Sequence, residues 1–278
     1  MEKKTLINTL NSFKNNTSIS ELDIELLFCH CLDINKTFLH TNPQKELSET
    51  QYSKINDLIQ RRLQGEPTWQ IIGKAPFWNL EFHVTKDVLT PRKETEFLIE
   101  EIIEMYKSNQ TGKLSALELG SGSGNISLTL AKEFPAFDFI SFDKSKKALK
   151  IAKKNQKELN VNNVNFIHSS DFSFIKKRKF DFFFSNPPYI KQDEINALQK
   201  EITSFEPRLA LDGGEDGLDF YKFIAKNIRT YLTPYASIFL EIGHTQRKEV
   251  EKIFKNEAFS LLKCKKDYSN LDRILIFN

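Results

Sequence analysis

The sequence predicts an α/β protein built on a doubly wound, seven-stranded and mostly parallel β-sheet, preceded by a small N-terminal helical bundle and a β-hairpin linker. Three observations lead to this prediction. From residue 115 onward, short apolar runs alternate with helical segments, which is typical of a parallel sheet. A glycine-rich turn, residues 118–124, follows the first of these runs. The first 70 residues, in contrast, show helical periodicity.

The N-terminal segment, residues 1–68, is predicted to be a bundle of short helices. Ser20 precedes one helical stripe and Ser48 precedes another, and Gln51 gives the second start the form of a capping box. Residues 1–75 carry 9 basic and 9 acidic side chains. Because a neutral helical module is a poor nucleic-acid clamp, we expect residues 1–68 to dock a protein substrate.

Residues 69–90 are predicted to form the β-hairpin linker, since Gly65-Glu66-Pro67 stops the preceding helix and partial alternation follows. Thr90-Pro91 opens a new helix, and the second domain is predicted over residues 91–278. Its expected strands are 116–119, 137–142, 164–168, 181–185, 237–242, 259–264 and 273–277, and its helices 126–132, 146–159, 218–232 and 246–255. Because only a turn separates the last two strands, we expect the final strand to run antiparallel at the edge of the sheet.

Composition excludes several classes of protein. The 40 basic and 37 acidic residues give a formal net charge of +3, which is not the excess expected of a protein bound to phosphates. Three cysteines are too few for a disulfide framework, and Cys29 and Cys31 face apart on a helix, so we expect no metal. There is no signal-peptide pattern and no apolar run of roughly 18 residues. We expect a cytoplasmic protein that does not associate with membranes.

Three glycines at alternate positions, Gly120, Gly122 and Gly124, follow the first predicted strand. Such a turn lets backbone N–H groups approach a ligand closely, although similar turns also bind dinucleotides and phosphates. The spacing differs from GxGxxG, and no Gly-Lys-Ser/Thr follows, which excludes a P-loop. Asp143 ends the second strand, where a carboxylate accepts hydrogen bonds from both hydroxyls of a ribose, in NAD as in other nucleosides.

Asp171 follows the third predicted strand, and Phe172 adjoins it. We expect Asp171 to accept a hydrogen bond from the exocyclic amine of adenine and Phe172 to stack on the base. The alternative is that Asp143 and Asp171 only cap strand ends, but the order of these elements along the chain favours a nucleoside site. The predicted cofactor-binding residues are Glu118, Gly120, Ser121, Gly122, Ser123, Gly124, Asp143, Asp171, Phe172 and Asn186.

The tetrapeptide Asn186-Pro187-Pro188-Tyr189 follows a strand that is apolar on both faces. Its prolines fix the backbone and remove two donors, which leaves the side-chain carbonyl of Asn186 and the backbone carbonyl of Pro187 as acceptors. Two convergent acceptors suit a substrate –NH2 group, and Tyr189 supplies a flat wall. If the group transferred to this nitrogen is a methyl carried by a sulfonium, the donor is already activated. The protein then mainly has to hold the nitrogen and the methyl carbon in line, roughly 3 Å apart.

From this tetrapeptide we predict that Asn186, Pro187 and Tyr189 are catalytic, and that these three residues and Pro188 bind the substrate. A turn that is merely stiffened by proline is the alternative.

With these motifs in this order, the sequence resembles the HemK/PrmC family, the protein-(glutamine-N5) methyltransferases that modify peptide chain release factors. The resemblance covers nearly the whole chain. It includes the helical N-terminal module, Phe77-Trp78, Asp143, Asp171 and residues 91–96, 118–124, 186–189, 206–211, 214–218 and 241–243.

This resemblance implies the fold of a class I Rossmann-like methyltransferase. It implies S-adenosyl-L-methionine as cofactor, S-adenosyl-L-homocysteine as product, and the glutamine of the GGQ motif of release factors as substrate. It also implies that residues 120–124, Asp143 and Phe172 hold the cofactor, and that Asn186, Pro187 and Tyr189 hold the glutamine side chain.

Two positions depart from the family pattern. Lys93 replaces a proline in the 91–96 motif, and Phe172 stands where some relatives carry Trp. The first change is expected to have little effect, because a proline near a helix start is favourable but not required. Either ring at position 172 can stack on adenine.

The same tetrapeptide occurs in N6-adenine and N2-guanine methyltransferases of nucleic acids. However, the one dense basic run, residues 176–179, is typical of a solvated turn. A glutamine methyltransferase of a ribosomal protein is a closer rival, and Glu94 and Glu96 argue against it. A non-enzymatic binding module would not need both the glycine turn and the tetrapeptide. We therefore expect a monomeric enzyme that binds release factors and makes no direct contact with nucleic acid.

Overall fold

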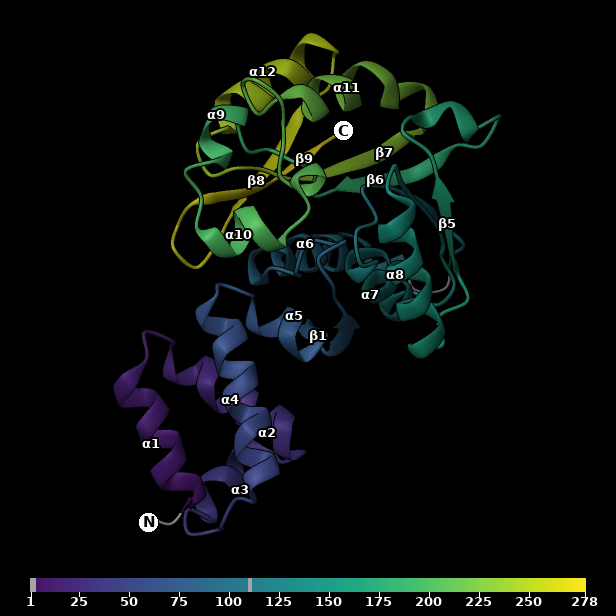
Figure 1. The fold of residues 1–278 in the computed structure, drawn as a ribbon. Helices are drawn as coiled ribbons and strands as arrows, with labels where there is room; N and C mark the ends of the chain where they lie inside the picture. Colours follow the sequence, from purple (N-terminus) through teal and green to yellow (C-terminus); the bar gives the residue numbers. More distant parts are fainter. Residues whose placement is uncertain (1–3, 110–111) are drawn as a thin grey trace. The chain divides into compact units, whose positions relative to one another are not determined.

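The computed structural model describes residues 4–109 and 112–278 (Figure 1). The chain divides into two compact units. The first comprises Met1–Lys74 together with Gln199–Phe205, and the second comprises Ala75–Leu198 together with Glu206–Asn278. Each unit has buried apolar clusters of its own.

The first unit is a bundle of helices. These are α1 (Leu6–Asn16), α2 (Glu21–Leu32), α3 (Lys36–Thr41), α4 (Glu49–Leu63), α5 (Thr68–Ile72) and α10 (Lys200–Phe205). The two predicted helix starts are confirmed. The Ser20 hydroxyl accepts a hydrogen bond from the Asp23 N–H at 3.1 Å, and Ser48 and Gln51 form a reciprocal capping box.

Helix α5 corrects the sequence-based interpretation of residues 69–73, which the alternation placed in the hairpin. Pro67 precedes this helix, and Gly73 ends it with φ of +79° and an N–H bonded to the Trp69 carbonyl at 2.8 Å. Proline before a helix and a left-handed glycine after it are standard boundary signals. The hairpin itself is shorter than predicted and consists of β1 (Lys74–Phe77) and β2 (Leu80–His83).

The second unit contains the predicted seven-stranded, mostly parallel sheet, which confirms the fold class. Its strand order is β5-β4-β3-β6-β7-β9-β8. The strands are β3 (Ser115–Leu119), β4 (Asp138–Asp143), β5 (Val164–His168), β6 (Phe180–Ser185), β7 (Leu232–Glu241), β8 (Leu261–Lys266) and β9 (Asp272–Phe277). Pairing is parallel from β5 through β7, and β9 runs antiparallel to both of its neighbours.

The prediction that the last strand lies at the edge of the sheet is wrong, although its antiparallel direction is confirmed. β9 lies between β7 and β8, and β8 occupies the edge. Residues 274–277 are buried, whereas Lys263 and Lys266 of β8 are exposed. An apolar run buries both of its faces in a sheet interior, while lysines suit an edge exposed to water.

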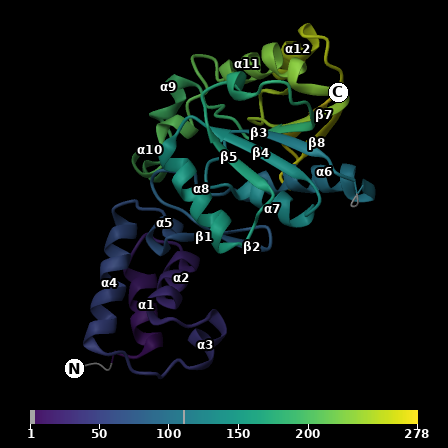
Figure 2. The same ribbon diagram turned by 90° about the vertical axis from the view of Figure 1, so that its right-hand side faces the viewer.

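Helices cover both faces of the sheet (Figures 1 and 2). One face packs against α6 (Glu96–Tyr106), α7 (Asn125–Glu133) and α8 (Lys146–Glu158), and the other against α11 (Asp219–Ile228) and α12 (Arg247–Asn256). Successive side chains of a strand point to opposite faces. Accordingly, Phe182 and Phe184 of β6 join the first core, and Phe183 joins the second.

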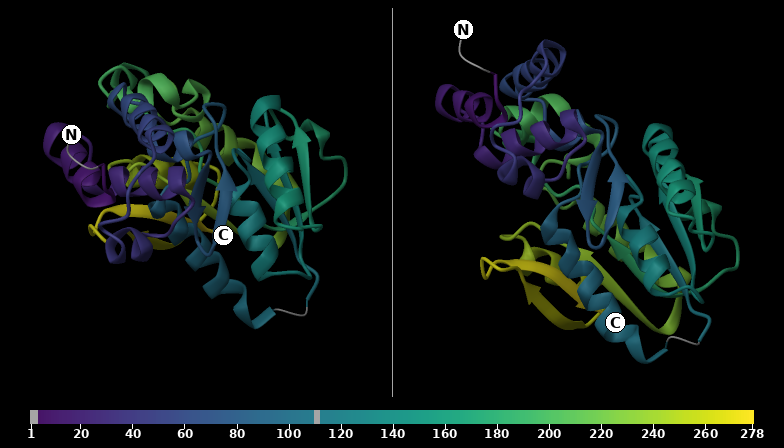
Figure 3. Two further views of the ribbon diagram at one scale, coloured as in Figure 1. Left: turned by 60° about the horizontal axis from the view of Figure 1, so that its bottom comes forward. Right: turned by 90° about the horizontal axis from the view of Figure 1, so that it is seen from below.

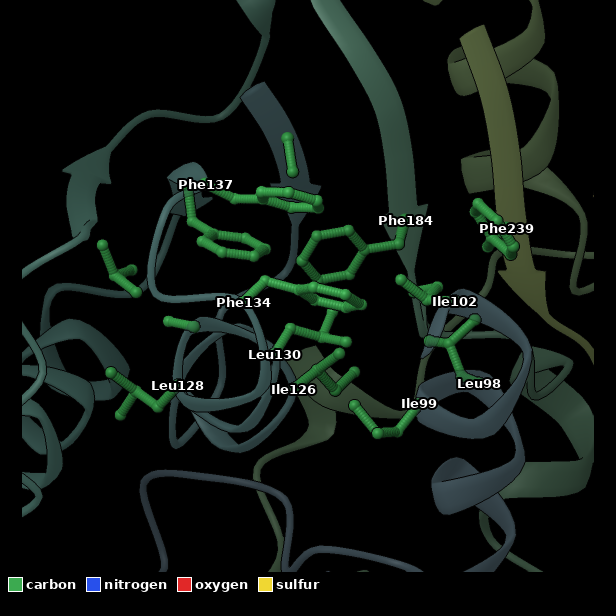
Figure 4. Packing of buried hydrophobic residues seen from close by; sticks show 14 of the residues in the cluster. Leu98, Ile99, Ile102, Ile126, Leu128, Leu130, Phe134, Phe137, Phe184 and Phe239 are labelled. Carbon is green, nitrogen blue, oxygen red and sulfur yellow. The ribbon is translucent and has the colours of Figure 1, made fainter. Parts of the chain in front are cut away.

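Figure 4 shows Phe184 and Phe239 in the first core, facing apolar side chains of α6 and α7. Figure 3 shows the hairpin of β8 and β9 beside α6, where Lys263 forms an ion pair with Glu101 at 2.7 Å. The remaining short elements of this unit are α9 (Gln192–Ile195) and the 3-10 turns η1 (Lys93–Thr95), η2 (Lys107–Asn109), η3 (Phe172–Phe174), η4 (Arg208–Ala210) and η5 (Arg229–Tyr231).

Two absences concern only the described part of the chain. Over residues 4–109 and 112–278, no helix combines the length and apolar character needed to cross a membrane. Within the same ranges, no group of three or more His, Cys, Asp or Glu side chains is placed to hold a metal ion.

Candidate active site

The glycine turn lies between the end of β3 and the start of α7. Gly120, Gly122 and Gly124 all have positive φ, at +87°, +52° and +80°. Gly124 is the N-cap of α7, and a Cβ there would come within 3.0 Å of both Leu128 and Phe166. Only glycine fits such a position without strain. The turn therefore brings its backbone close to the cavity above the strand ends.

Asp143 ends β4 next to this turn. Its Oδ2 accepts a hydrogen bond from the Gly122 N–H at 3.0 Å, and its Oδ1 accepts one from the Ser145 N–H at 2.8 Å. Burial raises the pKa of the Asp143 carboxyl, and these two hydrogen bonds counteract part of that rise. A carboxylate has about four lone-pair sites, so acceptor capacity remains for a ligand's hydroxyl groups.

The Asn186-Pro187-Pro188-Tyr189 turn begins at the carboxyl end of β6, beside β3. The Asn186 Nδ2 group donates a hydrogen bond to the hydroxyl oxygen of Thr95 at 3.1 Å. Because the amide nitrogen is engaged there, the Asn186 carbonyl oxygen is the free acceptor of this side chain. The backbone carbonyl of Tyr189 is used internally, since it accepts a hydrogen bond from Gln246 Nε2 at 2.9 Å.

One cavity joins these elements at the carboxyl ends of the parallel strands, which is where open α/β sheets bind ligands. Predicted site residues in its wall are Gly120, Ser121, Gly122, Ser123, Asp143, Asn186 and Pro188. Further wall residues come from 87–95, 207–210, the ends of β4 and β5, and α11; they include Asp87, Arg92, Thr95, Ser169, Leu209 and Phe220.

Several predicted residues lie outside this wall. Glu118 is buried beneath the turn, where the Ser141 hydroxyl donates to it, and Ser141 in turn contacts the Ser121 hydroxyl at 2.6 Å. Burial raises the pKa of Glu118 to about 8. Pro187 is buried, and Tyr189 packs with the second core. None of the three residues Glu118, Pro187 and Tyr189 lies in the cavity wall.

The two residues predicted to contact adenine, Asp171 and Phe172, also lie outside this wall. Asp171 accepts a hydrogen bond from the Ser173 N–H at 2.8 Å and so caps the short turn η3. The Phe172 side chain is buried and stacks on Phe223 with ring centroids 5.3 Å apart. The aromatic side chains in the cavity wall are instead Phe142 and Phe220.

Arg92, Thr95 and Glu206 are wall or near-wall residues for which the sequence predicted no individual role. Arg92 forms an ion pair with the buried Glu206 carboxylate at 2.6 Å, and that carboxylate also accepts a hydrogen bond from the Thr90 N–H. The only hint of their importance in the sequence is that residues 91–96 and 206–211 both carry part of the family resemblance. Only the fold reveals that the two segments meet at the cavity.

The chain is similar to known proteins over most of its length. The family model for the PrmC N-terminal domain matches residues 6–73, and the model for the methyltransferase small domain matches residues 93–215. A release factor glutamine methyltransferase from Thermodesulfovibrio yellowstonii is 40% identical, over 97% of this chain and 96% of its own length. One from Caulobacter vibrioides is 36% identical, over 92% of this chain and 88% of its own.

Among solved structures, a ribosomal protein L11 methylase from Lactobacillus delbrueckii subsp. bulgaricus matches with a TM-score of 0.50 and 15% sequence identity. The match covers 67% of this chain and 79% of that one. At such low identity the likeness concerns the fold alone.

The fold and the site define a Rossmann-like, S-adenosylmethionine-dependent methyltransferase. Identity of 35% or more over most of both chains makes the assignment more specific. The chain belongs to the family of release factor glutamine methyltransferases, which confirms the predicted family.

Proposed function

We propose that this enzyme transfers the methyl group of S-adenosylmethionine to the N5 side-chain amide nitrogen of the GGQ glutamine in peptide chain release factors. The observation that carries the proposal is the orientation of Asn186. Its amide nitrogen is bound to Thr95, and its carbonyl oxygen is therefore free for the cavity. A primary amide offers two N–H donors, and this oxygen accepts one of them.

The cofactor fits the residues at the strand ends. Residues 120–123 and the buried Asp143 carboxylate would hold it, with Asp143 accepting from the ribose hydroxyls. When bound, the cofactor supplies a methyl group already activated by its sulfonium charge. Phe220 offers an aromatic face in the same wall. We assign it the stacking role that the sequence suggested for Phe172.

The protein's own contribution is to align the two reacting groups. The oxygen of Asn186 orients the amide nitrogen, and Pro188 shapes the adjoining wall. Holding two reacting groups in register removes much of the entropic barrier to a displacement. The proposed roles of Pro187 and Tyr189 are to keep Asn186 in place, since both lie outside the cavity wall.

The proposal includes the remaining expectations about partners. The N-terminal domain, residues 1–68, is assigned the docking of the release factor, and the enzyme is assigned to the cytoplasm as a monomer that makes no direct contact with nucleic acid. The balanced charge of residues 1–75 supports a protein partner over an anionic polymer. Size-exclusion chromatography with light scattering tests the oligomeric state.

The decisive experiment incubates the enzyme with labelled S-adenosylmethionine and purified release factors from the same organism, with mass spectrometry to locate the methyl group. We expect a single methyl on the GGQ glutamine and none on a release factor whose glutamine is replaced by alanine. Faster labelling of a ribosomal protein or of naked DNA or RNA would refute the substrate.

Asn186→Ala provides the matched enzyme variant. It should lose methyl transfer by about 100-fold or more, because the variant lacks the oriented acceptor. Binding of S-adenosylhomocysteine should persist in the same variant, as measured by calorimetry. Full activity in a folded Asn186→Ala protein would contradict the role of this side chain.

A further inference from the structure

Glu241 is a buried acid beside the Asn186 turn that has no part in the site described so far. It ends β7, the strand next to β6, and is 1% exposed. The hydroxyl groups of Thr95 and Tyr189 are the hydrogen-bonding neighbours of its carboxyl group and lower its pKa, against the effect of burial. Among the described residues, its Oε2 has no hydrogen-bond partner. A buried acid that is incompletely bonded costs stability, so the fold itself gives no reason for it.

The charged and titratable groups around Glu241 come from several elements. Arg273 of β9 and Glu94 of η1 act on it electrostatically, and Tyr189 lies on the turn after β6. Tyr221 of α11 donates a hydrogen bond to the backbone carbonyl of Glu241 at 2.9 Å. The Arg273 guanidinium is held elsewhere by an ion pair with Asp267 at 2.9 Å. The Thr95 hydroxyl is therefore the direct link from Glu241 to Asn186.

The number of protons available along this link determines the orientation of the Asn186 side-chain amide. A threonine hydroxyl has one proton to donate, and a carboxylate can only accept. Thr95 therefore donates to the Glu241 carboxylate and can only accept from Asn186. The –NH2 half of the Asn186 amide must then face Thr95, as its 3.1 Å hydrogen bond shows. Its carbonyl oxygen must face the other way.

We propose that Glu241, acting through Thr95, is a positioning residue that keeps the Asn186 side-chain oxygen directed at the substrate amide. This inference rests on the proposed role of Asn186 in holding that amide. Without the carboxylate the hydroxyl proton of Thr95 is free to turn toward Asn186. The amide then flips and presents its –NH2 group to the substrate –NH2 group, where two donors meet without an acceptor.

The protonation state of Glu241 makes this link depend on pH. Burial raises the pKa of the Glu241 carboxyl to about 7, with Glu94 adding to the rise and Arg273 and the hydrogen bonds opposing it. The carboxylate is the form that aligns Asn186. Activity should therefore be highest above this pKa and fall as the pH drops through it.

The test compares the variants Thr95→Val, Thr95→Ser and Glu241→Gln with the wild-type enzyme, using a release factor as substrate. Thr95→Val keeps the shape but removes the hydroxyl, and kcat should drop about 10- to 100-fold because the acceptor is misplaced. Thr95→Ser restores the hydroxyl and should recover most of kcat. Because Thr95 lines the cavity, calorimetry with S-adenosylhomocysteine accompanies each assay and separates cofactor binding from alignment.

The pH profile of kcat gives the second readout. The wild type should lose activity below about pH 7, approaching tenfold per pH unit for a single essential carboxylate. Glu241→Gln cannot ionise and should lack this limb. Wild-type kcat in Thr95→Val, or an unchanged acidic limb in Glu241→Gln, would overturn the inference. If Glu241→Gln does not fold, the Thr95 pair still decides.

These outcomes also separate the inference from the proposed function. If the wild type does not methylate a release factor, or if Asn186→Ala remains active, the proposed function fails. If the wild type is active, Asn186→Ala is inactive and Thr95→Val equals the wild type, only the link through Glu241 fails.

Discussion

Asp143 offers the sharpest test of the cofactor assignment, through the nearly isosteric substitution Asp143→Asn. The wild-type carboxylate already binds two backbone N–H groups, one on each oxygen. An asparagine keeps one acceptor oxygen and replaces the other by an –NH2 donor. It loses the charge as well as one of the two acceptor positions.

The magnitude follows from the bonds that remain for the ligand. A hydrogen bond to a charged group contributes about 1.5–3 kcal/mol, so two ribose hydroxyls correspond to roughly 3–6 kcal/mol. Since about 1.4 kcal/mol is a tenfold change in affinity, the full range is on the order of 100- to 10,000-fold. Neighbouring bonds do not add fully, and we therefore expect a loss of about 100-fold in affinity for S-adenosylhomocysteine by isothermal titration calorimetry.

Asp171→Asn is the matched control, because Asp171 is also an acid that follows a strand and caps a turn. Its hydrogen bond goes to Ser173, and it lies outside the cavity wall. The affinity of the Asp171→Asn variant for the cofactor should stay within about threefold of the wild type, a change of less than about 1 kcal/mol in binding free energy. Thermal melting without ligand confirms that both variants are folded. A folded Asp143→Asn protein with affinity within about tenfold of the wild type would refute the ribose assignment.

Two further predictions concern an aromatic pair and a buried acid. Phe220→Leu should weaken cofactor binding by about tenfold because a stacking face in the cavity is lost, whereas Phe172→Leu should lower the melting temperature and leave affinity nearly unchanged; the reverse pattern in calorimetry and melting would restore Phe172 as the stacking residue. Burial raises the pKa of Glu118 from 4.5 to about 8, so the stability from its neutral form is fully present below the unfolded pKa and is lost as pH rises through 8. The free energy of unfolding, measured with urea at pH values between 4.5 and about 8, should fall with rising pH in the wild type and not in Glu118→Gln. The same dependence on pH in both proteins would contradict the raised pKa.

The parts of the site that lie at strand ends could be predicted from sequence because local patterns define them. Alternation of apolar runs and helices fixes the parallel sheet, and parallel strands bring their carboxyl ends to one edge. The glycine turn, Asp143 and Asn186 follow three such strands and meet at one cavity. Their grouping could therefore be predicted without knowing any contact between distant segments of the chain.

Side-chain direction could not be predicted in the same way. Phe172 comes four residues after the end of β5, and its position in the sequence suits either a cavity wall or a core. The structure buries it against Phe223 and Tyr231, which lie more than fifty residues further along the chain. A ring takes the place where it loses most contact with water, and that depends on helices that the local sequence does not specify.

The grouping of residues 199–205 with the N-terminal unit was also beyond sequence reasoning. Within that unit, Gln70 Nε2 donates a hydrogen bond to the Phe205 carbonyl at 2.9 Å, and Arg62 forms an ion pair with Glu201 at 2.7 Å. These partners are separated by more than 130 positions in the sequence. Polar contacts of this kind have no periodicity, so a pattern of apolar residues cannot reveal them.

Contacts between distant segments also give a physical reason why residues 91–96 carry part of the family resemblance. Three of its side chains have separate long-range partners. Arg92 pairs with Glu206, Thr95 accepts from Asn186, and Glu96 accepts from the backbone N–H of Trp78 at 2.7 Å. Lys93, which departs from the family pattern, is exposed at the first position of η1. A proline is tolerated at the start of a helical turn, where its missing N–H has no helical partner to lose. The substitution at Lys93 therefore leaves all three contacts in place, and the alignment of Asn186 depends on Thr95 rather than on the residue that varies.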